Sequence, residues 1–472
     1  MSKNEAKETR EPKVSFGYSL LTVALCVAVL LVTTLAFGGK LQVGFLLAMV
    51  VAYVMAMIKG FKFSDLETAS YDFARKAMTP VMFLFAVGIM IAMWIACGAV
   101  PTIIYFGLKL ISPSIFLLVA LLLCSVASLC TGTSWGTMGS VGVAMMGIGI
   151  GLGINPALTA AAVICGAMFG DKMSPLSDTT NLCPALAGCD VMTHVKHMFY
   201  TTVPSYVITI VFFLVMGFKH TSDSYDSTMT DQIMTAIQGN FSMGFLQVLP
   251  VILVLVLLIL QKPAFLSIMI GGIAGFVVAL IVGGDSISEL LTFMYSGYVL
   301  ESGVAVVDNL FTRGGAFNMC SIVMIQLFSC AFAGILHRSG IITTLVEPLV
   351  RLCKSNGLLM TITGLLCVGI NLTGSMTMAQ VLTGTLMKPA FDEKDLAPEN
   401  LSRALEDFGT FSSALIPWNN TGIFIAATLA VGPAYIPFCV LLYITPIFDI
   451  IYAFTGFSMK KKVHAEASDA QA

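Results

Sequence analysis

The stretch Pro175-Leu176-Ser177-Asp178-Thr179-Thr180-Asn181 places a proline and a run of polar side chains inside an otherwise apolar region. A second such stretch, Pro417-Trp418-Asn419-Asn420-Thr421-Gly422, begins 242 positions later. A Thr-Gly pair precedes each proline by 44 positions, Thr131-Gly132 in one half and Thr373-Gly374 in the other. Paired breaks at matching positions of two halves are typical of secondary transporters, in which unwound helix ends face each other near mid-membrane.

The composition places the chain in a bilayer. It is 57% hydrophobic and 11% charged, whereas a soluble chain carries about twice that charge. Apolar stretches such as 19–35, 44–58 and 246–260 reach or approach the roughly 20 residues that span a membrane as a helix. We therefore expect an all-α polytopic membrane protein. The first apolar segment is too long for a signal sequence and predicts a retained first helix.

Other classes are disfavoured by charge and by cysteine spacing. The net charge of -2 gives no sign of nucleic-acid binding. The twelve cysteines form no CxxC pair, and we interpret them as small buried apolar residues rather than disulfides or metal ligands. This interpretation covers Cys124, Cys130, Cys165 and Cys183.

The offset of 242 residues indicates an internal duplication. It holds without a gap from about Val81 to Ala187. It pairs residues that begin or interrupt helices, including Pro156 with Pro398 and Pro175 with Pro417. The prediction is a transmembrane repeat at 15–220, an external loop at 221–241 and a second transmembrane repeat at 242–457. Cytoplasmic tails are expected at 1–14 and 458–472.

Loop charge suggests the orientation of the repeats. The loop 59–77 carries four basic residues, whereas its counterpart 285–316 carries only Arg313 among four acidic ones. Since basic loops stay in the cytoplasm, the first loop should be cytoplasmic and the second external, and the basic tails place both termini inside. We therefore predict inverted-topology repeats with re-entrant hairpins and broken helices, an architecture that serves alternating access.

Asp178 is the leading site candidate from the sequence. An ionised aspartate at a helix centre costs roughly 3 kcal/mol unless it faces a cavity or is neutralised by a proton or cation. Ser177, Thr179, Thr180 and Asn181 add oxygen ligands around it, so the sequence predicts a Na+ site at Asp178. The alternative is that Asp178 only caps a helix at 178–192.

Further candidates lie near both breaks. Asp171, beside Lys172, is either a second cation ligand or half of a local ion pair. In the second half, Arg403 and Asp407 are spaced to pair on one helix face, which leaves Glu406 either as part of a functional charge cluster or near water. Asn419, Asn420 and Thr421 are candidates for a substrate or second site. The expected hairpin residues are Thr131, Gly132, Thr133, Ser134, Thr373, Gly374 and Ser375.

Two histidines and one acid have less specific interpretations. His194 and His197 follow the first break and are either pH-sensing groups or anchors at the membrane interface. Asp449, in the last apolar segment, has no assigned role.

Several motifs resemble one transporter family closely. They are Gly132–Thr137, Gly170–Asn181, Arg313–Gly315, Leu401–Asp407 and Ile416–Asn419, and they resemble the NhaC-type sodium/proton antiporters over nearly the whole chain. The resemblance implies the ion transporter superfamily, with inverted repeats, two re-entrant hairpins, frequent homodimers and a place in a bacterial inner membrane. Carboxylate transporters of that superfamily carry Ser-Asn-Thr at each hairpin tip. Here Asp178 stands at the first tip, and its charge favours a cation.

The resulting hypothesis is Na+/H+ antiport, with the lipid bilayer, Na+ and H+ as partners and no cofactor. The alternative is Na+- or H+-coupled exchange of an organic acid of the malate/lactate type, or of an amino acid, at Asn419, Asn420 and Thr421. An intramembrane aspartyl protease is disfavoured because Met168 stands where the GxGD motif needs glycine. No phosphate loop supports an ATP-driven pump, so we do not expect an enzyme.

Overall fold

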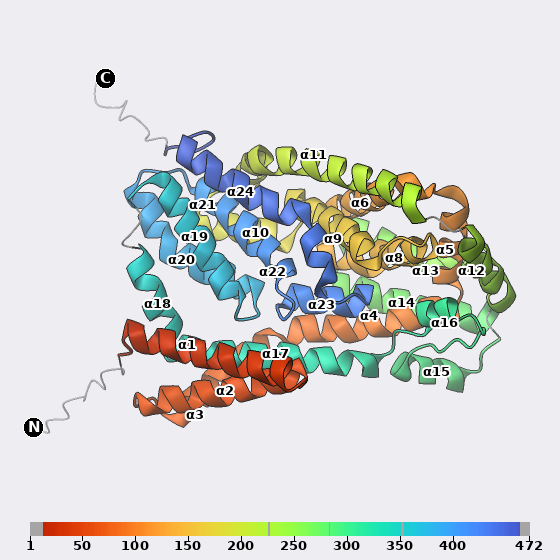
Figure 1. The fold of residues 1–472 in the computed structure, drawn as a ribbon, viewed down its shortest axis with the longest axis horizontal. Coiled ribbons are helices and arrows are strands. Elements are labelled where there is room, and N and C mark those ends of the chain that lie inside the picture. The colour runs from red at the N-terminus through yellow and green to blue at the C-terminus, as the bar shows by residue number, and fades with distance from the viewer. Residues whose placement is uncertain (1–12, 225–226, 283, 351–353, 463–472) are drawn as a thin grey trace, which may run out of the picture. The chain divides into compact units, whose positions relative to one another are not determined.

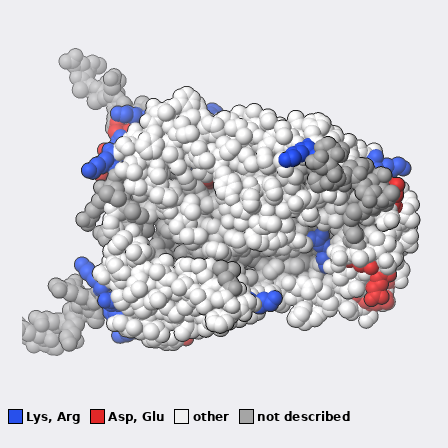
Figure 2. Space-filling model, viewed as in Figure 1, with Lys and Arg blue, Asp and Glu red and all other residues white. Residues whose placement is uncertain are grey.

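A computed structural model describes residues 13–224, 227–282, 284–350 and 354–462. All regular elements in these ranges are helices, and seven of the described helices are long and apolar enough to cross a membrane. A further pair, 230–240 and 245–259, is bent by 100° at a short break. The expected all-α polytopic fold is confirmed. On the face drawn in Figure 2, the charged side chains lie mostly near the two ends of the view, and most of the area between them is uncharged, as expected of a surface in contact with lipid.

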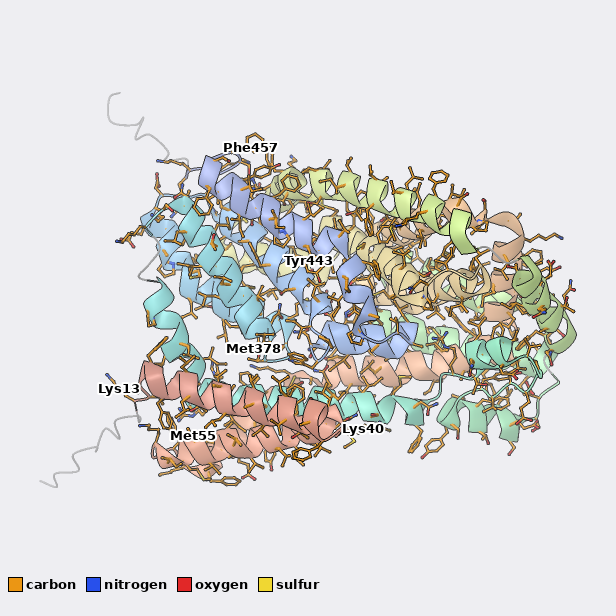
Figure 3. All side chains as sticks on the ribbon, in the orientation of Figure 1. Lys13, Lys40, Met55, Met378, Tyr443 and Phe457 are labelled. Carbon is orange, nitrogen blue, oxygen red and sulfur yellow. The ribbon has the colours of Figure 1, made fainter. Side chains whose placement is uncertain are left out.

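The chain divides into two compact units, and the smaller comprises residues 1–78 and 324–352. Its helices are α1 (Phe16–Leu31), a π-helical turn η1 (Val32–Ala36), α2 (Leu41–Ile58), α3 (Phe63–Lys76), most of α17 (Ala316–Arg338) and α18 (Ile341–Val350). Ala48, Ala52 and Ala56 are buried on one face of α2. Small residues four positions apart let α1 and α2 pack closely, and Tyr18 Oη donates to Met55 O at 2.8 Å. Met55 is labelled in Figure 3.

The larger unit comprises residues 79–323 and 353–472. Its first helices are α4 (Met78–Ala96), α5 (Ala99–Leu110), α6 (Pro113–Thr131), α7 (Ser134–Thr137), η2 (Met138–Gly142), α8 (Val143–Gly151), α9 (Pro156–Met173), α10 (Asp178–Ala187) and α11 (Val191–Ser224). Then come α12 (Ser227–Asn240), α13 (Phe245–Ile259), α14 (Ala264–Val282), α15 (Ile287–Ser296), α16 (Ala305–Phe311) and the start of α17. The segment 221–241, expected as an external loop, therefore contains the end of α11 and all of α12.

The second half of this unit repeats the element order of the first (Figure 1). It contains α19 (Asn356–Asn371), α20 (Met376–Glu393), α21 (Pro398–Ala404), the π-helical η3 (Leu405–Thr410), α22 (Phe411–Leu415), α23 (Asn420–Leu429), the 3-10 turn η4 (Pro433–Phe438) and α24 (Val440–Thr455). The continuous helix α21–η3–α22 begins and ends 242 residues after α9, and α23 begins and ends 242 residues after α10. This agreement supports the duplication, while the inverted orientation stays a prediction.

Two details differ from the sequence-based expectations. The helix after the first break ends at Ala187, followed by Gly188 at φ 96°, and does not reach residue 192. Glycine supplies the left-handed conformation that ends a helix there. Among the four cysteines interpreted as buried, Cys130 is exposed, whereas Cys124, Cys165 and Cys183 are buried.

Candidate functional site

Each Thr-Gly turn lies beside the polar break of its own half. Gly132 ends α6 at φ 67°, and a Cβ there would come within 2.7 Å of the Leu176 side chain. In the second half, Gly374 has φ 101°, and its carbonyl accepts a hydrogen bond from Asn420 N at 3.0 Å. Only glycine fits these two turns without strain, so the glycines permit each hairpin to approach its break.

Asp171 is a nearly buried carboxylate near the end of α9, 6% exposed. Its Oδ2 accepts a hydrogen bond of 2.6 Å from Ser134 Oγ, at the start of α7. The local Asp171–Lys172 ion pair that we considered is absent, because Lys172 contacts Asp407 instead. Within the described ranges no basic side chain pairs with Asp171.

Glu406 is a second buried carboxylate, in the π-helical turn η3. Its Oε1 accepts from Thr179 Oγ1 at 2.9 Å, and its Oε2 accepts from Cys183 Sγ at 3.0 Å. The interpretation that places Glu406 near water is therefore wrong. The reason is that η3 packs against α10, whose Thr179 and Cys183 supply the donors. Such π-helical turns inside helices are frequent at functional sites.

Two hydroxyl groups lie between these carboxylates. Ser177 Oγ and Thr179 Oγ1 are 3.1 Å apart, and Thr179 Oγ1 donates a hydrogen bond to Glu406. Ser177 and Glu406 both lie close enough to the Asp171 carboxylate to act on it electrostatically. The start of α10 therefore brings together Ser177, Thr179, Asp171 and Glu406, four of the residues selected from the sequence.

Two buried ion pairs surround this group. Lys172 pairs with Asp407, and its Nζ lies 4.6 Å from the centroid of the Phe411 ring. Arg403 pairs with Asp449, with Nε at 2.9 Å and Nη2 at 2.7 Å from the same Oδ1. These contacts show that the predicted Arg403–Asp407 pair is wrong. Each residue has a partner on another helix, and the wider turns of η3 change the spacing that an α-helix would give.

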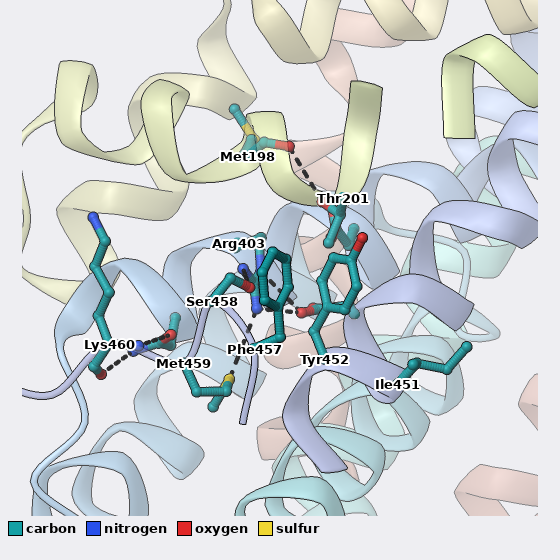
Figure 4. A network of polar contacts seen from close by, with 12 residues as sticks. Met198, Thr201, Arg403, Ile451, Tyr452, Phe457, Ser458, Met459 and Lys460 are labelled. Atoms are coloured by element: carbon teal, nitrogen blue, oxygen red, sulfur yellow. Dashed lines mark hydrogen bonds and ion pairs between the residues drawn. The ribbon is translucent and has the colours of Figure 1, made fainter. Parts of the chain in front are cut away.

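The segment that follows α24 closes over Arg403. Nη1 of Arg403 donates to Ser458 Oγ at 2.7 Å, and its Nη2 lies 3.8 Å from Met459 Sδ (Figure 4). Lys460 contacts the same helix, because its backbone carbonyl accepts a hydrogen bond from Asn400 Nδ2 at 2.7 Å. Residues 458–460, expected as part of a cytoplasmic tail, are thus held against α21.

The charges of this region do not balance. Lys172 and Arg403 are buried and pair with Asp407 and Asp449. In the described ranges no basic group lies at ion-pair distance from Asp171 or Glu406, although Lys172 is close enough to Glu406 to act on it electrostatically. An unpaired buried charge costs several kcal/mol. A proton or a bound cation on these two carboxylates would remove that cost.

Asp178 lies apart from the buried carboxylates. It is exposed in the first turn of α10, and its side chain forms no hydrogen bond or ion pair with the described residues. Ser177 occupies the N-cap position, so the proposed N-cap role of Asp178 is wrong by one residue. A carboxylate in a first helical turn is favoured by the helix dipole.

Thr180 and Asn181 satisfy the backbone around the break. Thr180 Oγ1 donates to the Lys172 carbonyl at 3.1 Å, which caps the end of α9. Asn181 Nδ2 donates to the carbonyls of Pro175 and Ser177 at 2.9 and 2.7 Å. Both side chains therefore stabilise the backbone conformation of the break.

The amides of the second break are largely engaged within the protein. Asn419 is buried, and its Nδ2 donates to Asn371 O at 2.9 Å and to Asn371 Oδ1 at 3.0 Å. Thr421 Oγ1 accepts from Ser413 Oγ at 2.9 Å, while Asn420 is partly buried. Asn371, Ser413 and Cys183 were missed as site residues. A polar residue three positions before Gly374 could have indicated Asn371.

His194 and His197 are fully buried, so their interpretation as interfacial anchors is wrong. Nδ1 of His194 lies 2.7 Å from Ser402 Oγ. The packing of α11 against α21 buries this pair. Among the described residues, no group of three or more His, Cys, Asp or Glu side chains resembles a resident metal site.

Comparison with known proteins agrees with this picture. Residues 166–457 match the Na+/H+ antiporter family. A Na+/H+ antiporter NhaC of Alkalihalophilus pseudofirmus is 36% identical over 456 residues, covering 96% of this chain and 98% of the relative. A malate-2H+/Na+-lactate antiporter of Bacillus subtilis is 35% identical over 93% of this chain and 95% of its own. An arginine/ornithine antiporter ArcD of Halobacterium salinarum is 32% identical over 98% and 96%. The chain therefore belongs to the Na+/H+ antiporter family and is a multi-pass membrane protein.

Proposed function

We propose that the protein exchanges Na+ for H+ by alternating access, with Asp171 and Glu406 as the groups that bind the ions. The observation that carries the proposal is their burial in one region without a basic group at ion-pair distance in the described structure. Hydroxyl groups serve both carboxylates: Ser134 donates to Asp171, and Thr179, which is hydrogen-bonded to Ser177, donates to Glu406. Relatives of the chain are antiporters, so it is a transporter and not an enzyme. No cofactor enters the proposal.

The chemistry follows from competition for the same carboxylates. A protonated carboxyl is neutral and can stay buried, and a carboxylate bound to Na+ is neutral as a pair. Hydroxyl and carboxylate oxygens suit a small hard cation. Ser134, Ser177 and Thr179 supply such hydroxyls within hydrogen-bond distance of the two carboxylates or of one another. Binding one ion therefore releases the other.

The two ion pairs have a different role in this proposal. Lys172–Asp407 and Arg403–Asp449 are internally neutralised, so they hold α9, α24 and α21–η3–α22 in register and leave the ions to Asp171 and Glu406. Asp178, exposed at the start of α10, is then the first carboxylate that a cation from solution meets.

A second candidate is coupled exchange of an organic acid or amino acid. It is favoured by two relatives of similar coverage whose names state malate, lactate, arginine and ornithine as substrates. Asn420, partly buried at the second break, is the amide in this region that the organic group could approach.

Proteoliposomes loaded with a pH-sensitive dye separate the two candidates. Addition of Na+ alone should move protons if the first is right, and the Asp171→Asn variant should lower this movement by about a hundredfold. If protons do not move with Na+ alone but move once malate, lactate or arginine is added, simple Na+/H+ exchange is contradicted and the second candidate is supported.

We further propose a bacterial inner-membrane location with both termini in the cytoplasm, and a homodimer. The basic loop 59–77 supports this orientation through the positive-inside rule. Reporter fusions after residue 462 should be active only with a cytoplasmic reporter, and a periplasmic signal would overturn the orientation.

A further inference from the structure

Arg313, between α16 and α17, is a cation that the ion-exchange site does not use. The residue is partly buried, and its Nη2 is fully buried without a hydrogen-bond partner in the described part of the chain. No carboxylate in those ranges forms an ion pair with it. A guanidinium is always charged and presents several donors, so this arrangement leaves binding capacity unused.

The backbone around Arg313 lies against the middle of a candidate membrane span. Gly315 N donates to Gly88 O at 2.7 Å, and Gly88 lies about half-way along α4, which spans Met78–Ala96. Gly314 and Gly315 have φ of 83° and 84°, and a Cβ on Gly314 would lie 2.9 Å from Gly88 O. The glycines therefore let the chain turn and touch α4 directly after Arg313.

The position of Arg313 is fixed by backbone contacts on both sides. Tyr298 N donates to the Arg313 carbonyl at 3.1 Å. Asn318 Nδ2 donates to the carbonyls of Gly314 and Ser296 at 2.8 and 2.9 Å. A backbone held in this way presents its side chain without a large cost in conformational entropy, which is what a preorganised binding site needs.

Nearby acids are engaged elsewhere. Asp308, five residues earlier, accepts from Ser302 N at 2.7 Å and from Ser302 Oγ at 2.6 Å. Glu289 accepts from Ser286 N and Oγ at 2.8 Å, and Glu301 is exposed. Asp308, Glu289 and Glu301 are therefore near Arg313 in the sequence, but none of them forms an ion pair with it.

We propose that Arg313 anchors a site for the carboxylate of a small organic solute. A guanidinium nitrogen that is buried without a partner is costly, and a carboxylate can bind the guanidinium through two parallel hydrogen bonds. The site lies outside the group formed by Asp171 and Glu406 and carries the opposite charge. It therefore goes beyond the proposed Na+/H+ exchange and does not depend on it.

Thermal unfolding of the purified protein tests the site without any transport. Sodium salts of acetate, lactate and succinate are compared with sodium chloride at fixed Na+ and ionic strength, and lactamide replaces lactate as an uncharged analogue. With at least one carboxylate, Tm should rise as its concentration is increased and then reach a plateau, since a ligand that binds only the folded state stabilises it. Lactamide and chloride should not. Absence of a carboxylate-specific rise in the wild type would overturn the proposal.

Three variants assign the effect to the side chain. Arg313→Gln should lose the rise, whereas Arg338→Gln, which removes an arginine of α17 outside the site, should keep it. Arg313→Lys keeps the charge without the planar fork and should raise the half-saturating concentration about tenfold; it also decides the matter if Arg313→Gln does not fold. A rise retained by Arg313→Gln, or one obtained only with phosphatidylglycerol in the micelle, would contradict a solute site.

Discussion

The break between α9 and α10 and the break between α22 and α23 join helices whose bounds lie 242 residues apart, yet their side chains differ. In the first, Ser134 donates to the Asp171 carboxylate at 2.6 Å. At the equivalent positions of the second, Ser413 Oγ lies 3.4 Å from the thioether sulfur of Met376. Equivalent positions thus hold a hydroxyl–carboxylate pair in one half and a hydroxyl–thioether pair in the other.

This difference teaches that the backbone is duplicated while the charge is not. Glu406 stands where the first half has Ile164, and Lys172 stands where the second half has Ala414. Each half therefore contributes one unpaired carboxylate, Asp171 or Glu406, to a shared region at the start of α10. An asymmetric site of this kind is what we expect of two similar repeats that enclose one set of ions.

The largest expected effect concerns the ion pair beside the site. Lys172→Met should destabilise the protein by about 3–5 kcal/mol, because it leaves Asp407 buried without a partner. The double variant Lys172→Met/Asp407→Leu should recover most of the loss. Thermal unfolding in detergent measures both.

Lys460→Met is the matched control. Lys460 forms an ion pair of 3.5 Å with Glu399 and is 47% exposed, so its loss should change stability by about 1 kcal/mol or less. An equal loss for Lys172→Met and Lys460→Met would show that burial does not set the strength of the first pair.

The second effect tests the functional asymmetry of the breaks. Asp171→Asn should lower Na+-dependent proton flux by about a hundredfold, which corresponds to roughly 2.8 kcal/mol, because the amide cannot release a proton. Ser413→Ala, at the equivalent position of the other break, should cost less than about tenfold. Equal losses in the two variants would make the breaks functionally equivalent and refute the asymmetry.

The sequence predicted the framework of this comparison well. Prolines, Thr-Gly pairs and the 242-residue offset predicted both breaks, since these residues act on the backbone locally. Asp171, Glu406 and Asp407 could be selected because charges stand out in apolar segments. Their partners could not be predicted, because Lys172–Asp407 and Arg403–Asp449 join helices far apart in the chain. The exposure of Asp178 and the thiol that Cys183 donates to Glu406 likewise depend on tertiary packing.

A third prediction concerns the hydroxyls. Thr179→Val removes the donor to Glu406 with little change in shape, so it should cost about 1–2 kcal/mol of ion binding. This corresponds to an increase of about five- to thirtyfold in the half-saturating Na+ concentration. Thr421→Val, its counterpart at the second break, should have less effect on that concentration in the same flux assay.

The smallest expected effect is a dependence of Na+ binding on pH. Where protons occupy the site, each unit rise in pH should lower the half-saturating Na+ concentration by up to about tenfold for each proton displaced. Asp171→Asn should flatten this dependence in binding titrations. A slope unchanged in that variant would mean that the proton is displaced from another group.

Proton release on Na+ binding tests the central claim most directly. Purified protein in weakly buffered detergent solution is mixed with NaCl, and the protons released are counted with a pH-sensitive dye, with choline chloride as the control salt. The account predicts saturable release by the wild type, reduced in Asp171→Asn and in Glu406→Gln and absent in the double variant. Release of the same size from the double variant would show that these two carboxylates are not the exchange site.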